Sequence, residues 1–298
     1  MSVMLLWIAL TAFQDANSSG PPVNWESARE LAPGIRLHQD VLESPRRLRR
    51  HAARIDLRQP GLQFTTTDRL EDWEPDVRET RRQTVRSFLR SERTAGRPVV
   101  LAFNADAFTP WPVPFDQETE SNLQGFAVCR EQLVSPGSGS PSFIRLKSGE
   151  GSMRITRDAT PADDIEIAVS GFSFCLQDGR VQPSGDDLHP RTGLGLSADG
   201  RWLVVLVVDG RRYSSEGSTT EELGQWLLDL GASDGINMDG GGSSTLAWWN
   251  SEATADDKSE LINRPVGNGL KLLTPASDDR FVSERANGNN VGIWLQAP

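Results

Sequence analysis

The sequence has few of the residues from which metal and redox sites are usually built. Its 298 residues include two cysteines and three histidines, the cysteines form no CxxC pair, and the histidines lack i, i+4 spacing. A zinc site is therefore not expected. Cys129 and Cys175 are compatible with one disulfide or with two buried thiols, and two cysteines do not decide between these states.

An excess of positive charge is also missing from the sequence. The chain has 31 Lys and Arg against 41 Asp and Glu, which gives a net charge of -10 and a pI near 4.9. Nucleic-acid binding draws its affinity from clustered basic side chains, so nucleic acid is not an expected partner. A soluble protein with a small or uncharged ligand fits this composition better.

Long apolar runs are missing too, so no stable membrane insertion is expected. The opening MSVMLLWIALTAF has the length of a signal-peptide core and is too short to span a bilayer as a helix. We interpret residues 1–26 as an export signal and linker, and residues 27–298 as one domain. Export to the periplasm or the exterior is the expectation. A cytoplasmic protein with an apolar N-terminal helix stays open, because a basic n-region is missing.

Hydrophobic periodicity predicts strands that outnumber two clear helices. Thr219 and Glu222 form a capping box in front of the second helix, which Gly231 closes. The expected fold is α+β, a single domain with a mixed, largely antiparallel twisted sheet core and flanking helices. The predicted helices cover 78–93 and 220–230, and the predicted strands include two near 55–64 joined by a turn, 99–104, 165–174, a central strand at 201–210, 234–238 and 289–298, with hairpins and loops in 135–164.

Three apolar strands end in polar residues, and these tips are the candidates for chemistry. Asn104 and Asp106 follow one strand, Asp209 follows the next, and Asp239 opens the block DGGGSS. Strand ends hold side chains rigidly at a sheet edge, and two aspartates in one cleft suit acid, base or nucleophilic work on a glycosidic bond. The alternative is that each Asp only caps a turn before glycine.

The triple glycine with two serines could present a row of backbone N–H donors to an anion. No Gly-Lys-Ser/Thr follows it, so it is not a Walker loop, and GLGLSA at 193–198 lacks the strand and helix of a dinucleotide site. A serine hydrolase elbow, GxSxG, does not occur. Arg191 with Thr192, and Arg264 with Asn268, suit a clamp on phosphate oxygens, although a structural arginine paired with an aspartate is an equal alternative.

The order of these segments resembles the phosphodiester glycosidase domain family. RIDLRQPGLQF, FNADAF, HPRTGLGLSADGRWLVVLVVDGR, the helix followed by DGGGSS, and NRPVGNGL carry the resemblance from about Leu31 to the C-terminus. It implies catalytic roles for Asp239 and Asp209. The substrate-binding residues that it implies are Asn104, Asp106, Arg191, Thr192, Gly240, Gly241, Gly242, Ser243, Ser244, Arg264 and Asn268.

The resemblance implies a hydrolase that cleaves the glycosidic C–O bond of an α-linked sugar-1-phosphodiester, such as an ester of N-acetylglucosamine-1-phosphate. No cofactor is expected, and the expected partner is a carbohydrate or sugar-phosphate substrate. Two other readings stay open. One is a metal-assisted phosphodiesterase with Asp106, Asp209 and Asp239 around Ca²⁺ or Mg²⁺. The other is a non-catalytic glycan-binding module of the cell envelope that uses tryptophans such as Trp111, Trp248 and Trp249.

Overall fold

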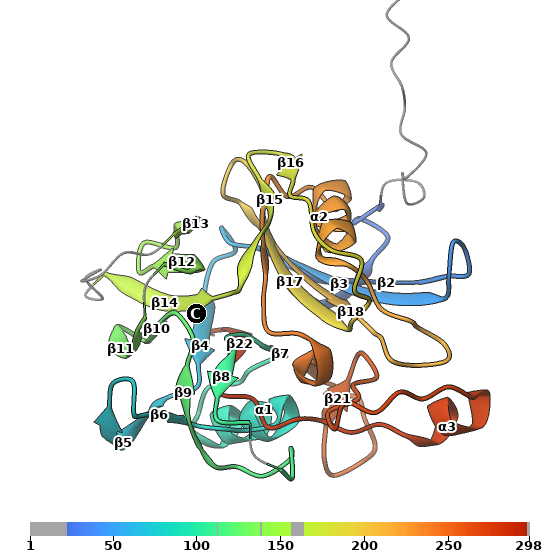
Figure 1. The fold of residues 1–298 in the computed structure, drawn as a ribbon. Helices are drawn as coiled ribbons and strands as arrows, with labels where there is room; N and C mark the ends of the chain where they lie inside the picture. Colours follow the sequence, from blue (N-terminus) through green and yellow to red (C-terminus); the bar gives the residue numbers. More distant parts are fainter. Residues whose placement is uncertain (1–22, 112, 138, 156–163, 297–298) are drawn as a thin grey trace, which may run out of the picture.

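The computed structural model describes residues 23–111, 113–137, 139–155 and 164–296. The N-terminal segment, for which an export signal is predicted, lies almost entirely outside these ranges. The described part contains 22 strands and three α-helices, and all pairs of neighbouring strands are antiparallel (Figure 1). The fold is therefore richer in β-structure than the α+β prediction, because strands also form where a helix or loops were expected.

The largest sheet has eight strands and supplies several site residues. The predicted central strand is confirmed, because β18 lies between β3 and β17 and is buried along almost its whole length. Its apolar side chains can fill both faces, since the sheet is covered on both sides. In spatial order the sheet contains β1 (Arg29–Ala32), β2 (Ile35–Leu42), β3 (Leu48–Asp56), β18 (Trp202–Val208), β17 (Arg191–Leu196), β19 (Asp234–Asn237), β15 (Ser173–Gln177) and β16 (Arg180–Val181).

A five-stranded sheet packs against one face of the large sheet. The main core lies between the two, where Ile55, Val205 and Ile236 meet Phe64, Phe103 and Ile293 among other buried residues. Burial of this apolar surface is the main favourable contribution to folding. The order of strands in the second sheet is β21 (Ser259–Leu261), β20 (Leu246–Trp249), β7 (Leu101–Asn104), β22 (Asn290–Leu295) and β4 (Leu62–Thr66).

Two further sheets complete the β-structure on one side of the molecule. The predicted hairpin region contains β12 and β13, although residues 156–163 lie outside the described part. The third sheet is β11 (Gln132–Pro136), β10 (Phe126–Cys129), β14 (Ile165–Ser170), β12 (Pro141–Leu146) and β13 (Gly151–Ile155). The fourth is β5 (Arg69–Glu74), β6 (Arg78–Arg81), β9 (Glu120–Leu123) and β8 (Phe108–Thr109).

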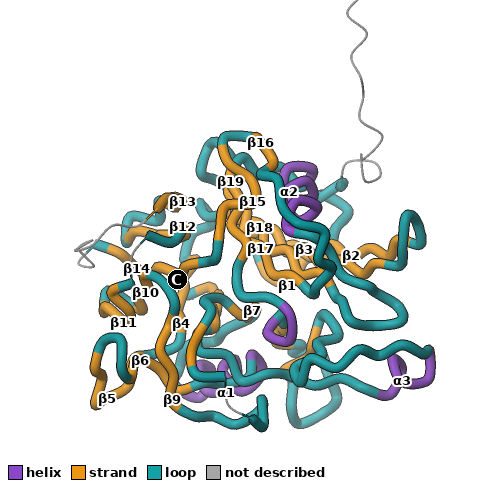
Figure 2. The backbone as a smooth tube through the Cα atoms, viewed as in Figure 1, coloured by secondary structure: helices purple, strands orange, loops and turns teal. Residues whose placement is uncertain are grey.

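The helices cover the outer faces of the two large sheets. Helix α2 (Thr220–Asp229) packs Leu223, Trp226 and Leu227 on the eight-stranded sheet, and the predicted capping box at Thr219 is present. Helix α1 (Val85–Thr94) covers the five-stranded sheet, and the two helices lie on opposite sides of the molecule (Figure 1). Helix α3 (Pro275–Arg280) lies at the edge, at the end of long loops (Figure 2).

Two predicted elements need correction. The helix predicted for 78–93 begins only at Val85, because Arg78–Arg81 pairs as β6 with β5 and β9, and Thr84 caps the helix by accepting a hydrogen bond from Ser87 N at 3.2 Å. The single strand predicted for 165–174 is two strands in different sheets. The first of these strands ends just before Gly171, where a Cβ would lie 2.5 Å from the carbonyl oxygen of Asn237.

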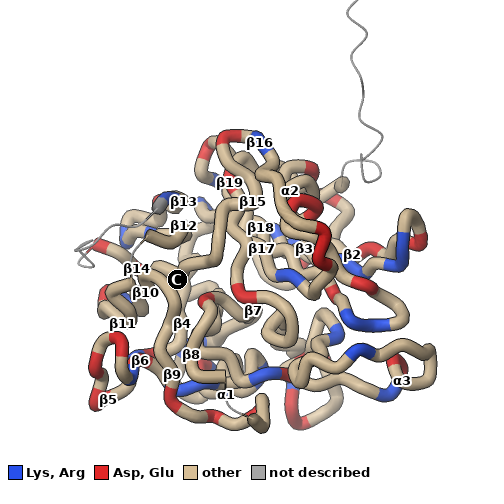
Figure 3. The backbone as a smooth tube through the Cα atoms, in the orientation of Figure 1, with Lys and Arg blue, Asp and Glu red and all other residues tan. Residues whose placement is uncertain are grey.

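The described residues include no helix that is both long and apolar enough to cross a membrane. Cys129 and Cys175 are both buried free thiols. Acidic and basic residues are interspersed along the backbone in the view of Figure 3.

Candidate active site

The candidate site is built around Asp239, two residues beyond the end of β19. The loop that follows is held by Asn104 at the end of β7. Asn104 Nδ2 donates to the carbonyl oxygen of Asp239 at 2.7 Å, while its Oδ1 accepts from Thr192 Oγ1 at 2.8 Å and from Thr245 N at 3.0 Å. One fully buried amide therefore joins three of the predicted segments, and Asn104 and Thr192 belong to the frame of the site.

The carboxylate of Asp239 is buried and only partly satisfied. Its exposed fraction is 2%, and its Oδ2 has no hydrogen-bond partner in the described structure. Desolvation raises the pKa of Asp239 to about 6, against the lowering effects of the Ser243 hydroxyl, the charge of Arg285 and the Gly240 amide. A buried oxygen without a partner is costly, so Oδ2 is a group that a substrate or a water could contact.

The loop needs its three glycines because other groups pack closely against its backbone. A Cβ at Gly240 would lie 3.0 Å from Pro190 O, one at Gly241 would lie 3.2 Å from Arg211 Nη2, and one at Gly242 would lie 2.5 Å from Arg285 Nη2. Gly241 also has a φ of 63°, in the left-handed region. Side chains here would push away two guanidinium groups.

Most backbone N–H groups of this loop already donate hydrogen bonds within the protein. Gly241 N donates to Pro190 O at 2.8 Å, and Ser243 N and Ser244 N donate to carbonyl oxygens within the loop at 3.2 and 3.4 Å. The Ser244 hydroxyl, by contrast, is buried and has no hydrogen-bond partner among the described residues. An anion at this loop would depend chiefly on the neighbouring guanidinium groups.

Three arginines supply that positive charge. Arg191, at the start of β17, donates to the carbonyl oxygens of Ser218 and Asp187, each at 3.1 Å, and to no other group in the described part of the chain. Arg211 lies against Gly241 with a left-handed backbone, and its guanidinium makes no hydrogen bond or ion pair with the described residues. Burial lowers the pKa of Arg191, Arg211 and Arg285, and the charge of Arg211 further lowers that of the other two, so the three groups share one electrostatic environment.

Arg285 was not among the predicted site residues. Its Nε donates to Gly267 O at 3.1 Å and its Nη1 to Ser243 Oγ at 3.4 Å, while its guanidinium carbon lies 4.8 and 4.9 Å from the ring centroids of Trp111 and Phe115. Such stacking holds a planar guanidinium in place. No motif surrounds Arg285 in the sequence, and only the fold brings it to Asp239.

Asp209 is buried beside this site with both carboxylate oxygens engaged. Oδ2 lies 3.2 Å from His51 Nε2, and Oδ1 accepts from Asn263 Nδ2 and from Arg264 N, each at 3.0 Å. Desolvation is the largest influence and would raise the pKa of Asp209, but these hydrogen bonds and the His51 charge together lower it below its ordinary value. A carboxylate so placed fixes the backbone of neighbouring segments.

The remaining predicted residues occupy other contacts. Asp106 is fully buried, accepts from Ser170 N at 2.7 Å and from Asn289 Nδ2 at 2.8 Å, and has its pKa raised to about 8 by desolvation. Arg264 Nη2 donates to the carbonyl oxygen of Asp278 at 2.6 Å, and Asn268 Oδ1 accepts from Leu270 N at 3.1 Å. Asp106, Arg264 and Asn268 therefore hold parts of the frame together.

The three aspartates of the metal hypothesis have different partners. Among the described residues there is no group of three or more His, Cys, Asp or Glu side chains that could hold a metal ion. The tryptophans of the glycan-binding hypothesis are also engaged, since Arg29 stacks on Trp248 at 4.3 Å and Arg93 on Trp249 at 4.0 Å. Trp111 remains 46% exposed.

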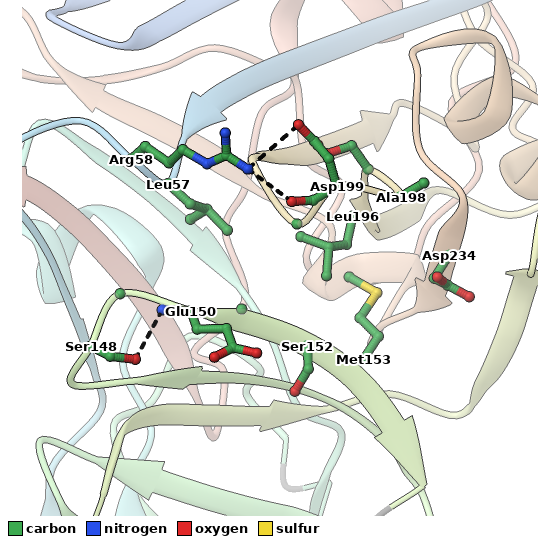
Figure 4. A pocket seen from close by; sticks show the side chains of 14 residues that line it. Leu57, Arg58, Ser148, Glu150, Ser152, Met153, Leu196, Ala198, Asp199 and Asp234 are labelled. Atoms are coloured by element: carbon green, nitrogen blue, oxygen red, sulfur yellow. Dashed lines mark hydrogen bonds and ion pairs between the residues drawn. The ribbon is translucent and has the colours of Figure 1, made fainter.

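A cavity of about 650 Å³ lies elsewhere, between the β12–β13 hairpin and the β17–β18 turn (Figure 4). Arg58 points toward Asp199 across it, with Nη2 donating to Asp199 O at 3.1 Å. Its other lining residues include Glu150 and Asp234. None of the predicted site residues lines this cavity.

Solved structures show which class of fold this is. The catalytic domain of zebrafish N-acetylglucosamine-1-phosphodiester α-N-acetylglucosaminidase, auto-inhibited by its pro-peptide, matches with a TM-score of 0.59 and 17% identity over 88% of this chain and 82% of that chain. A hypothetical protein from Synechocystis matches with a TM-score of 0.54 and 13% identity over 94% of this chain and 64% of that chain. A Burkholderia pseudomallei protein titled "Putative exported protein" matches with a TM-score of 0.54 and 12% identity over 85% of this chain and 75% of that chain.

Comparison with family sequence profiles identifies the family. The chain belongs to the phosphodiester glycosidase family, whose sequence profile matches residues 99–273. Family and fold together support a glycosidase-type hydrolase with a carbohydrate-type substrate. The SPβ prophage-derived uncharacterized protein YomE of Bacillus subtilis strain 168 is 41% identical over 90 residues, which are 30% of this chain and 14% of that protein. Arg285 lies outside the matched segment.

Proposed function

We propose that this protein hydrolyses the C–O bond between an α-linked sugar and the phosphate of a sugar-1-phosphodiester. The observation that carries the proposal is Asp239, a buried carboxylate with one unpartnered oxygen, which lies near the charge of Arg285 and opens a glycine loop against which Arg191 and Arg211 pack. An N-acetylglucosamine ester is the first substrate to test, because the zebrafish protein of the same fold is named for it.

The arginines bind the phosphate and stabilise the leaving group. A phosphodiester carries one negative charge, and its departure from the anomeric carbon as a phosphate monoester adds a second. Arg211 has no hydrogen bond to lose when it turns toward the phosphate, and Arg285 is already held by its aromatic neighbours. Preorganised positive charge of this kind stabilises charge that develops in the transition state. A phosphate leaving group is a weak base, so no acid is required.

Asp239 acts as the general base. Its Oδ2 takes a proton from a water molecule as the water oxygen bonds to the anomeric carbon, and the electrons of the breaking C–O bond remain on the phosphate oxygen. The products are the free sugar and a phosphate monoester, and the proton leaves Asp239 to solvent. Since Asp209 has its oxygens engaged, one acting carboxylate remains, and direct attack by water predicts inversion at the anomeric carbon.

Asp209 and Asn104 are positioning residues in this proposal. Asp209 fixes the backbone at Arg264 and the side chain of Asn263, which in turn donates to Ser244 O at 3.0 Å. Asn104 fixes the carbonyl group of Asp239. The positive charge at the phosphate comes from arginines, so we propose that turnover needs no metal ion.

The test is a turnover assay on α-N-acetylglucosamine-1-phospho-O-methyl ester and its glucose analogue, with and without EDTA, followed by NMR. Release of free sugar and methyl phosphate that persists in EDTA supports the proposal. Release of sugar-1-phosphate would show P–O cleavage, and inactivation by EDTA would favour the metal-assisted phosphodiesterase. Ligand binding without turnover would favour the glycan-binding module.

We also propose that the protein is exported, on the evidence of the apolar opening of the chain. Mass spectrometry of the protein recovered from its native source tests this, because a mature protein that has lost the apolar residues 1–13 supports cleavage of a signal peptide. An intact Met1 in the cytoplasm would contradict it.

A further inference from the structure

Arg82 is a fully buried arginine that lies between β6 and α1. Its exposed fraction is 0%, it makes no ion pair with the described residues, and its Nη1 has no hydrogen-bond partner among them. Burial lowers the pKa of Arg82, and no charged group of the described chain counteracts this effect. A buried charge without an anion is costly, so the contacts that Arg82 does make indicate a role other than stabilising the fold.

The hydrogen bonds of Arg82 fix residues 113–119, the segment that precedes β9. Its Nε donates to Thr119 Oγ1 at 3.0 Å, its Nη2 donates to Gln117 O at 2.8 Å, and its backbone N–H donates to Thr119 O at 2.8 Å. The same segment is held at Phe115, whose carbonyl oxygen accepts from Ala286 N at 2.9 Å. The segment is therefore anchored to the interior at one end and to the neighbour of Arg285 at the other.

A column of stacked groups also leads from Arg82 to Arg285. The guanidinium carbon of Arg82 lies 5.7 Å from the ring centroid of Phe108, and this ring stacks on Trp111 with centroids 5.4 Å apart and planes 8° apart. Trp111 and Phe115 then lie 4.8 and 4.9 Å from the guanidinium carbon of Arg285. The column runs from the interior to the surface, because Phe108 is 0% and Trp111 46% exposed. Arg82 closes its buried end.

Arg285 depends on these rings for its position. Its own hydrogen bonds are one to Gly267 O at 3.1 Å and a long one to Ser243 Oγ at 3.4 Å. The charges of Arg82 and Asp239 both act on Arg285, since the first lowers its pKa and the second raises it. Arg285 thus lies between the buried arginine and the candidate base.

We propose that Arg82 is a positioning residue, which fixes the aromatic neighbours of Arg285 and so keeps this guanidinium in place for the phosphate. The inference rests on the proposed function, because it assumes that Arg285 contacts the phosphate. Arg82 itself does not touch the substrate, since it is fully buried behind Phe108.

Calorimetry with methyl phosphate, one product of the proposed reaction, tests this role. Arg82→Met removes the hydrogen bonds and the charge, whereas Arg82→Lys keeps the charge and loses the planar fork. We expect the Kd to rise about tenfold in both variants. Arg82→Met should melt at a temperature near that of the wild type, because the loss of hydrogen bonds is offset by the removal of a buried charge.

Arg93→Met is the matched control. Arg93 also lies over a tryptophan ring, 4.0 Å from the centroid of Trp249, its Nη1 donates to Val99 O at 2.9 Å, and burial lowers its pKa. None of these contacts involves a residue of the candidate site. The Kd for methyl phosphate should therefore stay within about twofold of the wild-type value.

A double-mutant cycle separates positioning from a general effect of charge. If Arg82 acts through Arg285, Arg82→Met should have no further effect in an Arg285→Met background, where Arg191 and Arg211 still bind the anion more weakly. Three outcomes would each overturn the proposal. They are wild-type affinity in Arg82→Met, wild-type affinity in Arg82→Lys, and multiplication of the two single effects in the double variant.

Near-ultraviolet circular dichroism of the free protein gives a readout that does not depend on phosphate. The signal of Trp111 is the difference between a protein and the same protein with Trp111→Phe. Arg82→Met should lose most of this signal, and Arg93→Met should keep it. An unchanged Trp111 signal in Arg82→Met would overturn the role of Arg82, whereas failure of the wild type to bind methyl phosphate would overturn the phosphate clamp of the proposed function.

Discussion

Asn104 donates to the carbonyl oxygen of Asp239 at 2.7 Å across two sheets of the fold, and its side chain joins three of the predicted segments. Asn104→Asp keeps the shape of the side chain but removes its donor and adds a buried charge next to a carbonyl oxygen. We expect the free energy of unfolding to fall by about 2–3 kcal/mol and turnover to fall with it. Urea unfolding monitored by circular dichroism measures the first effect.

Asn24→Asp is the matched control for that change. Asn24 is exposed, and its side chain uses only its oxygen, which accepts from Glu26 N at 3.1 Å. An aspartate keeps this hydrogen bond, so the urea concentration at the midpoint of unfolding of this variant should stay near that of the wild type. A midpoint for Asn104→Asp equal to that of Asn24→Asp would contradict the assigned role of Asn104.

Asp239→Asn should separate activity from stability. The variant loses the base, so kcat should fall by about 10³-fold or more. The pKa of Asp239 is about 6 in the folded protein against 3.8 as the ordinary value, and this difference of about 2 units corresponds to about 3 kcal/mol at neutral pH as an upper limit. A neutral amide avoids the burial of that charge, so the variant should unfold at a higher temperature at pH 7.

The sign of this effect depends on pH. Between about pH 4 and pH 6 the folded protein holds the Asp239 proton while the unfolded chain does not, so stability falls as pH rises through that window. The advantage of Asp239→Asn over the wild type should therefore vanish below about pH 4 and be complete above about pH 6. A melting-temperature difference that does not change with pH would contradict the raised pKa.

The same pKa should appear in the kinetics. A general base must be ionised, so kcat/KM of the wild type should decline about tenfold per pH unit below about pH 6 and reach a plateau above it. Stopped assays with the methyl ester between pH 4 and pH 8 measure this acidic limb of the pH profile.

The first sugar anomer to appear by NMR should be the β form, and accumulation of the α form would show retention and require a second carboxylate.

Asp209→Asn should lower the stability of the fold and have little effect on the decline of kcat/KM at acidic pH. Because the folded pKa of Asp209 is below its ordinary value, the carboxylate stabilises the fold above about pH 4, and this contribution is lost as pH falls through the folded pKa. We expect a loss of about 2–4 kcal/mol at pH 7, since His51 would face an amide in a buried site. Asp279→Asn, at an exposed aspartate on α3, is the control.

Local sequence signals were sufficient for some of these features. Helix α2 was predicted from the capping pair Thr219 and Glu222, and both contacts of the box are present. The loop after β19 was predicted from an aspartate in front of three glycines, and the structure shows guanidinium groups against two of them. In each case the decisive interactions lie within a few residues or require the absence of side chains.

Other features depend on contacts between distant segments. The start of α1 was misplaced because β6 is fixed by pairing with β9, about forty residues further along the chain, and helical spacing of apolar residues says nothing of such pairing. The break at Gly171 reflects the close approach of Asn237. His51 meets Asp209 across 158 residues, and Arg285 reaches the site without any motif around it.

Arg211→Met tests the phosphate clamp most directly. The guanidinium of Arg211 makes no hydrogen bond or ion pair with the described residues and its burial lowers its pKa, so its removal should leave the melting temperature unchanged or raise it. If Arg211 holds the phosphate, kcat/KM should fall about 10²- to 10³-fold. Arg264→Met provides the contrast. Arg264 Nη2 donates to Asp278 O at 2.6 Å, so that variant should lose stability, and its kinetic defect should follow the fraction of folded protein. Normal kcat/KM in Arg211→Met would remove Arg211 from the clamp and leave Arg191 and Arg285 to hold the phosphate.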